Sequence, residues 1–110
     1  MPRPPELTPE ARAAALEKAT RARRTRAEAK EKLKMGAMNL SELLEQAGGE
    51  GDEARALASL KVLSAIESMP GLGKVRARRL VEELKISPER RLQGLGRNQR
   101  SALLDYFERG

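Results

Sequence analysis

Large hydrophobic residues are concentrated in the last two-thirds of the chain. Of its 27 Leu, Val, Ile, Met, Phe and Tyr residues, 22 lie at or after position 36. There they recur at the three- and four-residue spacing of amphipathic helices, and strand signals are absent. We therefore predict an all-α fold, in which residues 36–110 form a compact helical module and residues 1–35 form an arm. The predicted helices of the module cover 40–47, 52–68 and 73–85, with a short helix after Ser87-Pro88-Glu89 and a last helix whose core face holds Leu103, Leu104 and Phe107.

Capping residues mark where several of these helices begin and end. Asn39, followed three residues later by Glu42, is close to a capping box. A glycine-rich loop over 48–51 ends the first helix, and Asp52 is the predicted cap of the next one. Pro70 should end that helix, because a proline drives the residue before it out of the helical region.

The arm is predicted to be an extended lead followed by one long helix. Pro2-Arg3-Pro4-Pro5 cannot be helical. Thr8 as N-cap and Pro9 at the first helical position then give a helix start, and no glycine or proline follows before about Lys34.

This long helix has few large hydrophobic residues. Between Leu16 and Leu33 only alanines stand among the charged residues, so the middle of the helix has little to bury. One interpretation is a solvated helix held by its intrinsic propensity. The other is a basic helix that lies along DNA, where the phosphates would be met by the cluster Arg21, Arg23, Arg24 and Arg26.

A glycine turn precedes the helix predicted over 73–85. Pro70 is followed by Gly71-Leu72-Gly73, and glycine lets the backbone approach a partner closely. The free amides at the start of a helix favour an anion, and a nucleic-acid phosphate is the natural candidate. The alternative is a structural corner in which Leu72 fills the core between two helices. Basic residues add positive charge at this end of the helix: Lys74, Arg76, Arg78 and Arg79.

A shorter copy of this pattern follows at an offset of 23 residues. Gly94-Leu95-Gly96-Arg97 repeats Gly71-Leu72-Gly73-Lys74, and an amphipathic helix again comes next. We predict a second glycine turn and a second backbone contact there. The repeat itself offers Gly94, Gly96 and Arg97 as candidate residues.

The charge distribution favours a polyanionic partner. The chain carries a formal net charge of +6, with a sequence pI near 10.2. Residues 1–35 carry +5, residues 36–58 carry −4 and residues 59–110 carry +5. Two basic segments separated by an acidic one indicate two contact surfaces joined by a solvated connector.

The composition excludes most chemistry that needs special side chains. The absence of Cys and His removes disulfides, thiol nucleophiles, imidazole bases and ordinary zinc sites. A nucleotide-binding P-loop fails, because Ser68 and Val75 stand where it needs glycine and a hydroxyl. Only Tyr106 and Phe107 are aromatic, so base stacking on exposed rings is not expected.

We expect no enzyme activity, no catalytic residues, no metal or other cofactor, and no small-molecule substrate. Without a signal peptide or membrane span, the protein should be cytoplasmic and have no membrane partner.

The glycine turn and its surroundings resemble a known protein family over nearly the whole chain. Residues 69–77 are similar to helix-hairpin-helix and helix–two-turn–helix DNA-backbone motifs, including that of bacterial ribosomal protein S-thirteen. The full set of landmarks resembles the actinobacterial integration host factors. These landmarks are Leu7-Thr8-Pro9-Glu10, the block 12–19, Asn39-Leu40, Lys61-Val62, the turn 70–75, Ile86-Ser87 and the run 90–96.

The resemblance implies a small nucleoid-associated protein, with a long N-terminal helix and a helical DNA-binding module. It implies binding to duplex DNA with little sequence preference, shaping or compaction of that DNA, and assistance in phage integration beside a phage integrase. Two departures stand out. Gln93 lies where relatives often have a basic residue, and the segment 47–59 is longer and more acidic than expected.

Three functional interpretations follow. The first is a non-enzymatic binder of duplex DNA. The second is an RNA-binding or ribosome-associated protein that uses the same hairpin, and the third is a helical scaffold whose charge serves solubility. The candidate DNA-binding residues are Gly71, Leu72, Gly73, Lys74, Arg76, Arg78, Arg90, Arg91, Gly94, Gly96, Arg97, Asn98, Arg21 and Arg24.

Overall fold

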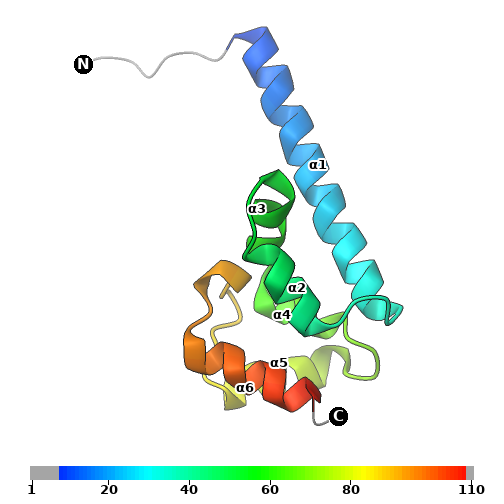
Figure 1. Cartoon of the computed structure of the whole chain (residues 1–110), viewed down its shortest axis with the longest axis vertical. Coiled ribbons are helices and arrows are strands. Elements are labelled where there is room, and N and C mark those ends of the chain that lie inside the picture. Colours follow the sequence, from blue (N-terminus) through cyan, green and yellow to red (C-terminus); the bar gives the residue numbers. More distant parts are fainter. Residues whose placement is uncertain (1–7, 109–110) are drawn as a thin grey trace, which may run out of the picture.

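The long helix α1 (Pro9–Lys34) runs along one side of the molecule, and its first half projects away from the other helices (Figure 1). This computed structural model describes residues 8–108, so the predicted extended lead at 2–5 lies outside the described residues. All elements named within 8–108 are helices, which confirms the predicted all-α class. They continue with α2 (Leu40–Ala47), α3 (Asp52–Ala58), α4 (Val62–Glu67), α5 (Gly73–Glu83), the short 3-10 helix η1 (Leu92–Gly94) and α6 (Arg97–Glu108).

Local sequence signals set the starts of α1 and α2. The Thr8 hydroxyl oxygen accepts a hydrogen bond from the Ala11 amide at 3.0 Å, and Pro9 opens α1 as predicted. Asn39 and Glu42 form the predicted capping box, because each side chain accepts a hydrogen bond from the backbone amide of the other. These caps satisfy amides that a helix start leaves without partners.

The last turns of α1 belong to the hydrophobic core. Ala29 and Leu33 are 5% and 0% exposed and belong to the core cluster, and α1 as a whole packs against α3 and α4. Leu16, in contrast, is 63% exposed on the projecting half. The division into an arm at 1–35 and a module at 36–110 stays a prediction, but burial extends across that boundary.

The core is built from every helix of the module. Leu43, Val62, Ile66 and Val81 are fully buried, and Leu103 of α6 joins them as predicted. Leu104 and Phe107 pack against this core while remaining partly exposed, which confirms the predicted inner face of α6.

The single helix predicted over 52–68 is wrong. Two helices, α3 and α4, are separated by Ser59-Leu60-Lys61, and Gly51 rather than Asp52 is the N-cap of α3. The chain breaks there because its backbone pairs with a distant segment. The Val62 amide donates to the Arg90 carbonyl, and the Leu92 amide donates to the Leu60 carbonyl, both at 2.8 Å. Lys61 and Arg91 thereby form an isolated antiparallel bridge.

The short helix predicted after Ser87 is also absent from the structure. The Ser87 hydroxyl accepts from the Glu89 amide at 3.3 Å and the Ser87 carbonyl from the Arg90 amide at 2.9 Å, which makes a turn. Arg90 and Arg91 then run extended along the α3–α4 break. Helix α5 ends at Glu83, slightly before the predicted end at 85, and Lys85 follows it with a φ of 58°.

Candidate nucleic-acid interface

The glycine turn between α4 and α5 has the backbone that its sequence predicts. Gly71 and Gly73 have φ angles of +79° and +73°, a left-handed region that L side chains rarely occupy. A Cβ at either glycine would meet no heavy atom within 4 Å, so the outer side of the turn is open. Leu72 is 7% exposed and fills the core, so the structural role considered for it is correct, and only its backbone can meet a ligand. Arg76 closes over the turn, with a guanidinium N–H donating to the Gly71 carbonyl at 3.4 Å.

A groove of about 410 Å³ runs from this turn to the end of α1. We call it the turn groove. Lys74 lies at the start of α5, and two lysines of α1 lie across from it, so three cations from distant parts of the chain share one depression. One acidic side chain, that of Glu67, also lines it. The lining residues are Lys30, Lys34, Ser64, Glu67, Ser68, Met69, Pro70, Gly71, Gly73 and Lys74.

A second groove of about 350 Å³ continues from the first along α1. We call it the Ser59 groove. Lys30 and Ser64 line both grooves, so the two form one continuous basic surface. The Ser59 groove is lined by Arg23, Arg26, Ala27, Lys30, Ser59, Leu60, Lys61, Ser64 and Arg91, which include five cations and no acid.

Backbone and side-chain contacts fix several of these cations. A guanidinium N–H of Arg26 donates to the Ser59 hydroxyl at 3.0 Å, and one of Arg91 donates to the Ser59 carbonyl. The Lys61 ammonium lies 2.9 Å from a carboxylate oxygen of Glu89. The hydrogen bond from Lys61 and its charge lower the pKa of the Glu89 carboxyl, and Arg91 and Arg78 add to the effect. Glu89 therefore keeps its negative charge at neutral pH, at the edge of a cationic surface.

The structure brings together a row of α1 cations, of which Lys30 and Lys34 were not among the predicted contacts. Arg23, Arg26, Lys30 and Lys34 follow one another at spacings of three or four residues, which places them on one face of a helix. This spacing is visible in the sequence. However, only the folded structure shows that the same face meets the glycine turn and Arg91.

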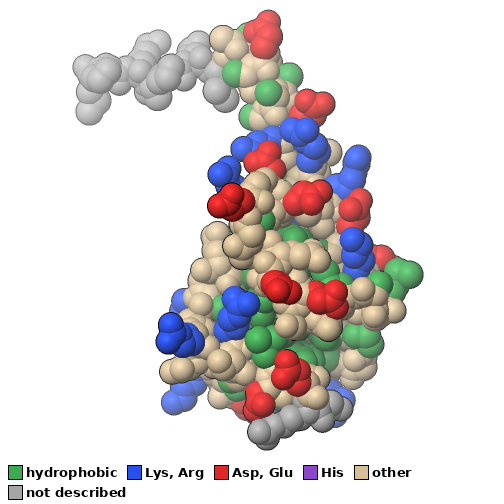
Figure 2. Space-filling view, viewed as in Figure 1, with side chains coloured by type: hydrophobic (Ala, Val, Ile, Leu, Met, Phe, Trp, Pro, Cys, Tyr) green, Lys and Arg blue, Asp and Glu red, His purple; other side chains and the backbone are tan. Residues whose placement is uncertain are grey.

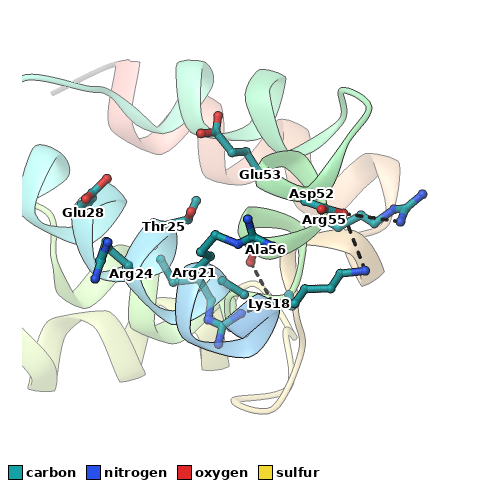
Figure 3. Close-up of a pocket in the computed structure, with 12 residues that line it drawn as sticks. Lys18, Arg21, Arg24, Thr25, Glu28, Asp52, Glu53, Arg55 and Ala56 are labelled. Atoms are coloured by element: carbon teal, nitrogen blue, oxygen red, sulfur yellow. Dashed lines mark hydrogen bonds and ion pairs between the residues drawn. The ribbon is translucent and has the colours of Figure 1, made fainter. Parts of the chain in front are cut away.

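Arg21 and Arg24, the predicted contacts of the arm, lie elsewhere. Both line a crevice of about 520 Å³ between α1 and α3 (Figure 3). There the cations mix with Glu28, Asp52 and Glu53, and Lys18 and Arg55 reach Asp52 at 3.7 and 3.8 Å. Acidic and basic side chains both lie along the upper part of the molecule in Figure 2. The four arginines expected to face phosphates do not all line one surface: Arg21 and Arg24 line this crevice, Arg23 lines the Ser59 groove, and Arg26 lines both. Their contact with DNA stays a prediction.

The second predicted glycine turn does not repeat the first. Neither Gly94 nor Gly96 has a left-handed φ. Gly94 ends η1, and a guanidinium N–H of Arg90 donates to its carbonyl at 2.8 Å. The Gly96 amide donates to the side-chain oxygen of Gln99 at 3.0 Å, so it already has a partner. The two segments are similar in sequence, but their backbone conformations differ.

The remaining predicted contacts, Arg78, Arg90, Arg97 and Asn98, are exposed and line neither the turn groove nor the Ser59 groove. Arg78 lies with Lys74 on the outer side of α5, where they line a shallow groove of about 320 Å³ together with Val75, Arg79 and Glu82. Arg97 and Asn98 open α6 and are exposed, as is Arg90. None of the helices within 8–108 is long and apolar enough to cross a membrane. In the same range no group of three or more acidic residues could hold a metal ion.

Known proteins resemble this chain over most of its length. The family model described as "S13-like H2TH domain" matches residues 33–107. The chain is 52% identical over 103 residues to "Integration host factor" of Mycobacterium tuberculosis, covering 94% of both chains. It is 50% identical over 103 residues to the protein of that name from Streptomyces coelicolor, covering 94% of this chain and 92% of that one.

A solved structure is similar as well. The chain described by "Structure of sIHF bound to an 8bp palindromic DNA" matches with a TM-score of 0.76 and 43% identity, covering 83% of this chain and 98% of that chain. Nearly the whole chain, and not the helical module alone, is thus similar to these relatives. The chain belongs to the family of the actinobacterial integration host factors.

Proposed function

We propose that this chain is a nucleoid-associated protein that binds duplex DNA through its phosphate backbone, with little dependence on sequence. The observation that carries the proposal is the continuous basic surface formed by the turn groove and the Ser59 groove. Cations from α1, from the α3–α4 break and from α5 line it, and the open glycine turn lies at one end. The similar solved chain is bound to DNA, which supports the same partner here.

Each group type in this surface suits a phosphate. Lysine and arginine neutralise backbone charge, and Gly71 and Gly73 allow close approach of the main chain. Contacts to phosphates fix a protein on the duplex without reading its bases. The two aromatic residues pack near the end of α6, with ring centroids 5.1 Å apart, and line neither groove. The surface is therefore suited to backbone recognition rather than to base stacking.

Salt dependence is the primary test of this function. Binding of a labelled duplex should weaken with salt, with a slope of log affinity against log salt of about −5 for roughly six phosphate contacts. A duplex of scrambled sequence should bind equally well. A hundredfold preference for one sequence would refute the backbone mechanism.

A charge reversal with a matched control separates DNA binding from a solubility role. Lys74→Glu places an anion in the turn groove, whereas Lys32→Glu makes the same change at an exposed position of α1 that lines neither groove. We expect a large loss of affinity for the first variant and a small loss for the second. Equal retention of duplex by both variants would favour the scaffold function.

The match to an S13-like domain makes an RNA ligand the second candidate. Competition of duplex DNA against structured RNA on the same protein distinguishes the two, and a clear preference for RNA would overturn the DNA proposal. Within the DNA function, we further propose that the chain shapes or compacts DNA in the nucleoid and assists phage integration beside an integrase. Measuring the end-to-end distance of a doubly labelled duplex with and without protein tests the shaping.

A further inference from the structure

Ser59 joins two parts of the basic surface that are far apart in the sequence. It ends α3, just before the break that leads to α4. Its hydroxyl accepts a hydrogen bond from Arg26, 33 residues earlier, and its carbonyl accepts one from Arg91, 32 residues later. One small residue thus holds two guanidinium groups that line the same groove.

The hydroxyl of Ser59 has a fixed direction. A serine hydroxyl can donate one hydrogen bond and accept two. Its single proton is donated to the Ala56 carbonyl at 2.7 Å, so its lone pairs remain for Arg26 at 3.0 Å. Ser59 and Arg26 are both half-buried, which shields this contact from competition with water. The Arg26 side chain is therefore held in one position before any ligand arrives.

A held arginine still has donors to offer. A guanidinium carries five N–H groups in a rigid plane, and Ser59 takes one from each arginine. Long side chains lose rotamer freedom when a ligand orders them, and a side chain that is already ordered loses less. The arrangement favours a ligand with closely spaced anionic oxygens, as on a DNA backbone.

We propose that Ser59 is a positioning residue for DNA, which fixes Arg26 and Arg91 so that their free N–H groups face neighbouring phosphates of one duplex. This inference rests on the proposed function, and the Ser59 groove is its site. Ser59 itself carries no charge, so it contributes to affinity without contributing to the number of neutralised phosphates.

The first test compares Ser59→Ala with Arg26→Gln. Ser59→Ala removes the hydroxyl and keeps the carbonyl that holds Arg91, so all cations remain. We expect its duplex affinity to fall by about 3- to 10-fold with an unchanged salt slope. Arg26→Gln removes one cation, and its salt slope should become shallower by about 0.9.

The double variant tests whether Ser59 acts through Arg26. If it does, adding Ser59→Ala to Arg26→Gln causes little further loss of affinity. Equal losses in both backgrounds would overturn the inference, and so would full affinity of Ser59→Ala. Ser59→Thr keeps a hydroxyl and should bind like the unmodified chain. Normal binding by Ser59→Thr would also show that the defect of Ser59→Ala comes from loss of the hydroxyl and not from disruption of the α3–α4 break.

Ser41→Ala is the matched control. Ser41 is exposed on α2 and lines neither groove, so this variant should bind duplex normally. A loss of affinity for Ser41→Ala equal to that for Ser59→Ala would assign the effect to the loss of any surface hydroxyl and overturn the role of Ser59. An unmodified chain that binds no duplex would instead refute the proposed function and the inference with it.

Discussion

The ammonium of Lys61 and the carboxylate of Glu89 lie 2.9 Å apart, across the backbone bridge that joins the α3–α4 break to the segment before η1. Lys61 lines the Ser59 groove, so this ion pair occupies one of its cations. Glu89 is exposed, and exposed ion pairs contribute little to stability. We infer that Glu89 acts mainly on the electrostatic field of the groove.

Replacing Glu89 should strengthen DNA binding. Glu89→Gln frees the Lys61 ammonium for a phosphate, and we expect a gain in duplex affinity of about 2- to 5-fold with a slightly steeper salt slope. Glu45→Gln is the control, because it removes the same charge from an exposed position of α2 outside both grooves. An equal gain for both variants, measured by fluorescence anisotropy, would assign the effect to net charge instead.

The same ion pair predicts a pH dependence. The pKa of Glu89 is lowered from 4.5 in the folded state, so its stabilising effect is complete above about pH 4.5 and is lost as the pH falls through the folded value. The difference in melting temperature between the unmodified chain and Glu89→Gln should therefore stay constant from about pH 5.5 to 8 and shrink below about pH 4.5. A difference that changes near neutral pH would contradict this assignment.

Features that depend on neighbouring residues were predictable from the sequence. Thr8 and Asn39 cap their helices through hydrogen bonds to amides three residues further along the chain. The left-handed turn at Gly71 and Gly73 requires only that glycine occupy these two positions. The break at Ser59–Lys61 could not be predicted, because it depends on backbone pairing with residues 90–92. Local helix propensity was overridden there by a long-range contact.

The candidate site was predictable to a similar extent. The turn and Lys74 were identified, since glycine and charge stand side by side in the sequence. Lys30 and Lys34 were not singled out, because a basic helix face gives no sign of what it packs beside. The prediction of a second glycine turn at Gly94 and Gly96 was wrong because a sequence match does not show which partners the backbone already has. Gly94 and Gly96 match the motif in letters, but Gln99 and Arg90 already bond their backbone.

The two glycine pairs should respond differently to alanine. Gly73→Ala forces an L side chain into a φ of +73° and should lower the free energy of unfolding by about 1–2 kcal/mol. Gly96→Ala should cost less than about 0.5 kcal/mol, because its φ is not left-handed and its Cβ would have only an ordinary contact with Gln99 at 3.5 Å. Urea denaturation of both variants measures the difference. Equal losses would mean that the second pair forms a strained turn after all.

The attachment of α1 to the module can be tested at its two leucines. Leu33→Ala removes a fully buried side chain and should lower the free energy of unfolding by about 2–5 kcal/mol. Leu16→Ala makes the same change at a residue that is 63% exposed, and its stability should hardly change. A small effect of Leu33→Ala would show that α1 separates from the core without loss, as expected of an independent arm.

The two sides of α1 make opposite predictions for DNA binding. Lys30 and Lys34 line the turn groove, whereas Arg21 and Arg24 line the crevice that also holds Glu28, Asp52 and Glu53. The double variant Lys30→Gln/Lys34→Gln should lose about 10- to 50-fold in duplex affinity at about 0.1 M salt, and its salt slope should become shallower by about 1.8. Arg21→Gln/Arg24→Gln removes the same net charge from the same helix.

The comparison is decisive because the helix, the charge change and the replacement residue, glutamine, are the same in both variants. If the groove is the DNA site, the arginine pair should lose only a few-fold in affinity, since nearby acids already weaken the positive field of the crevice. Circular dichroism should show equal helix content for both variants, so that a difference in affinity reports on contacts with DNA. A larger loss for the arginine pair would place the duplex along the crevice and leave the glycine turn as a structural corner.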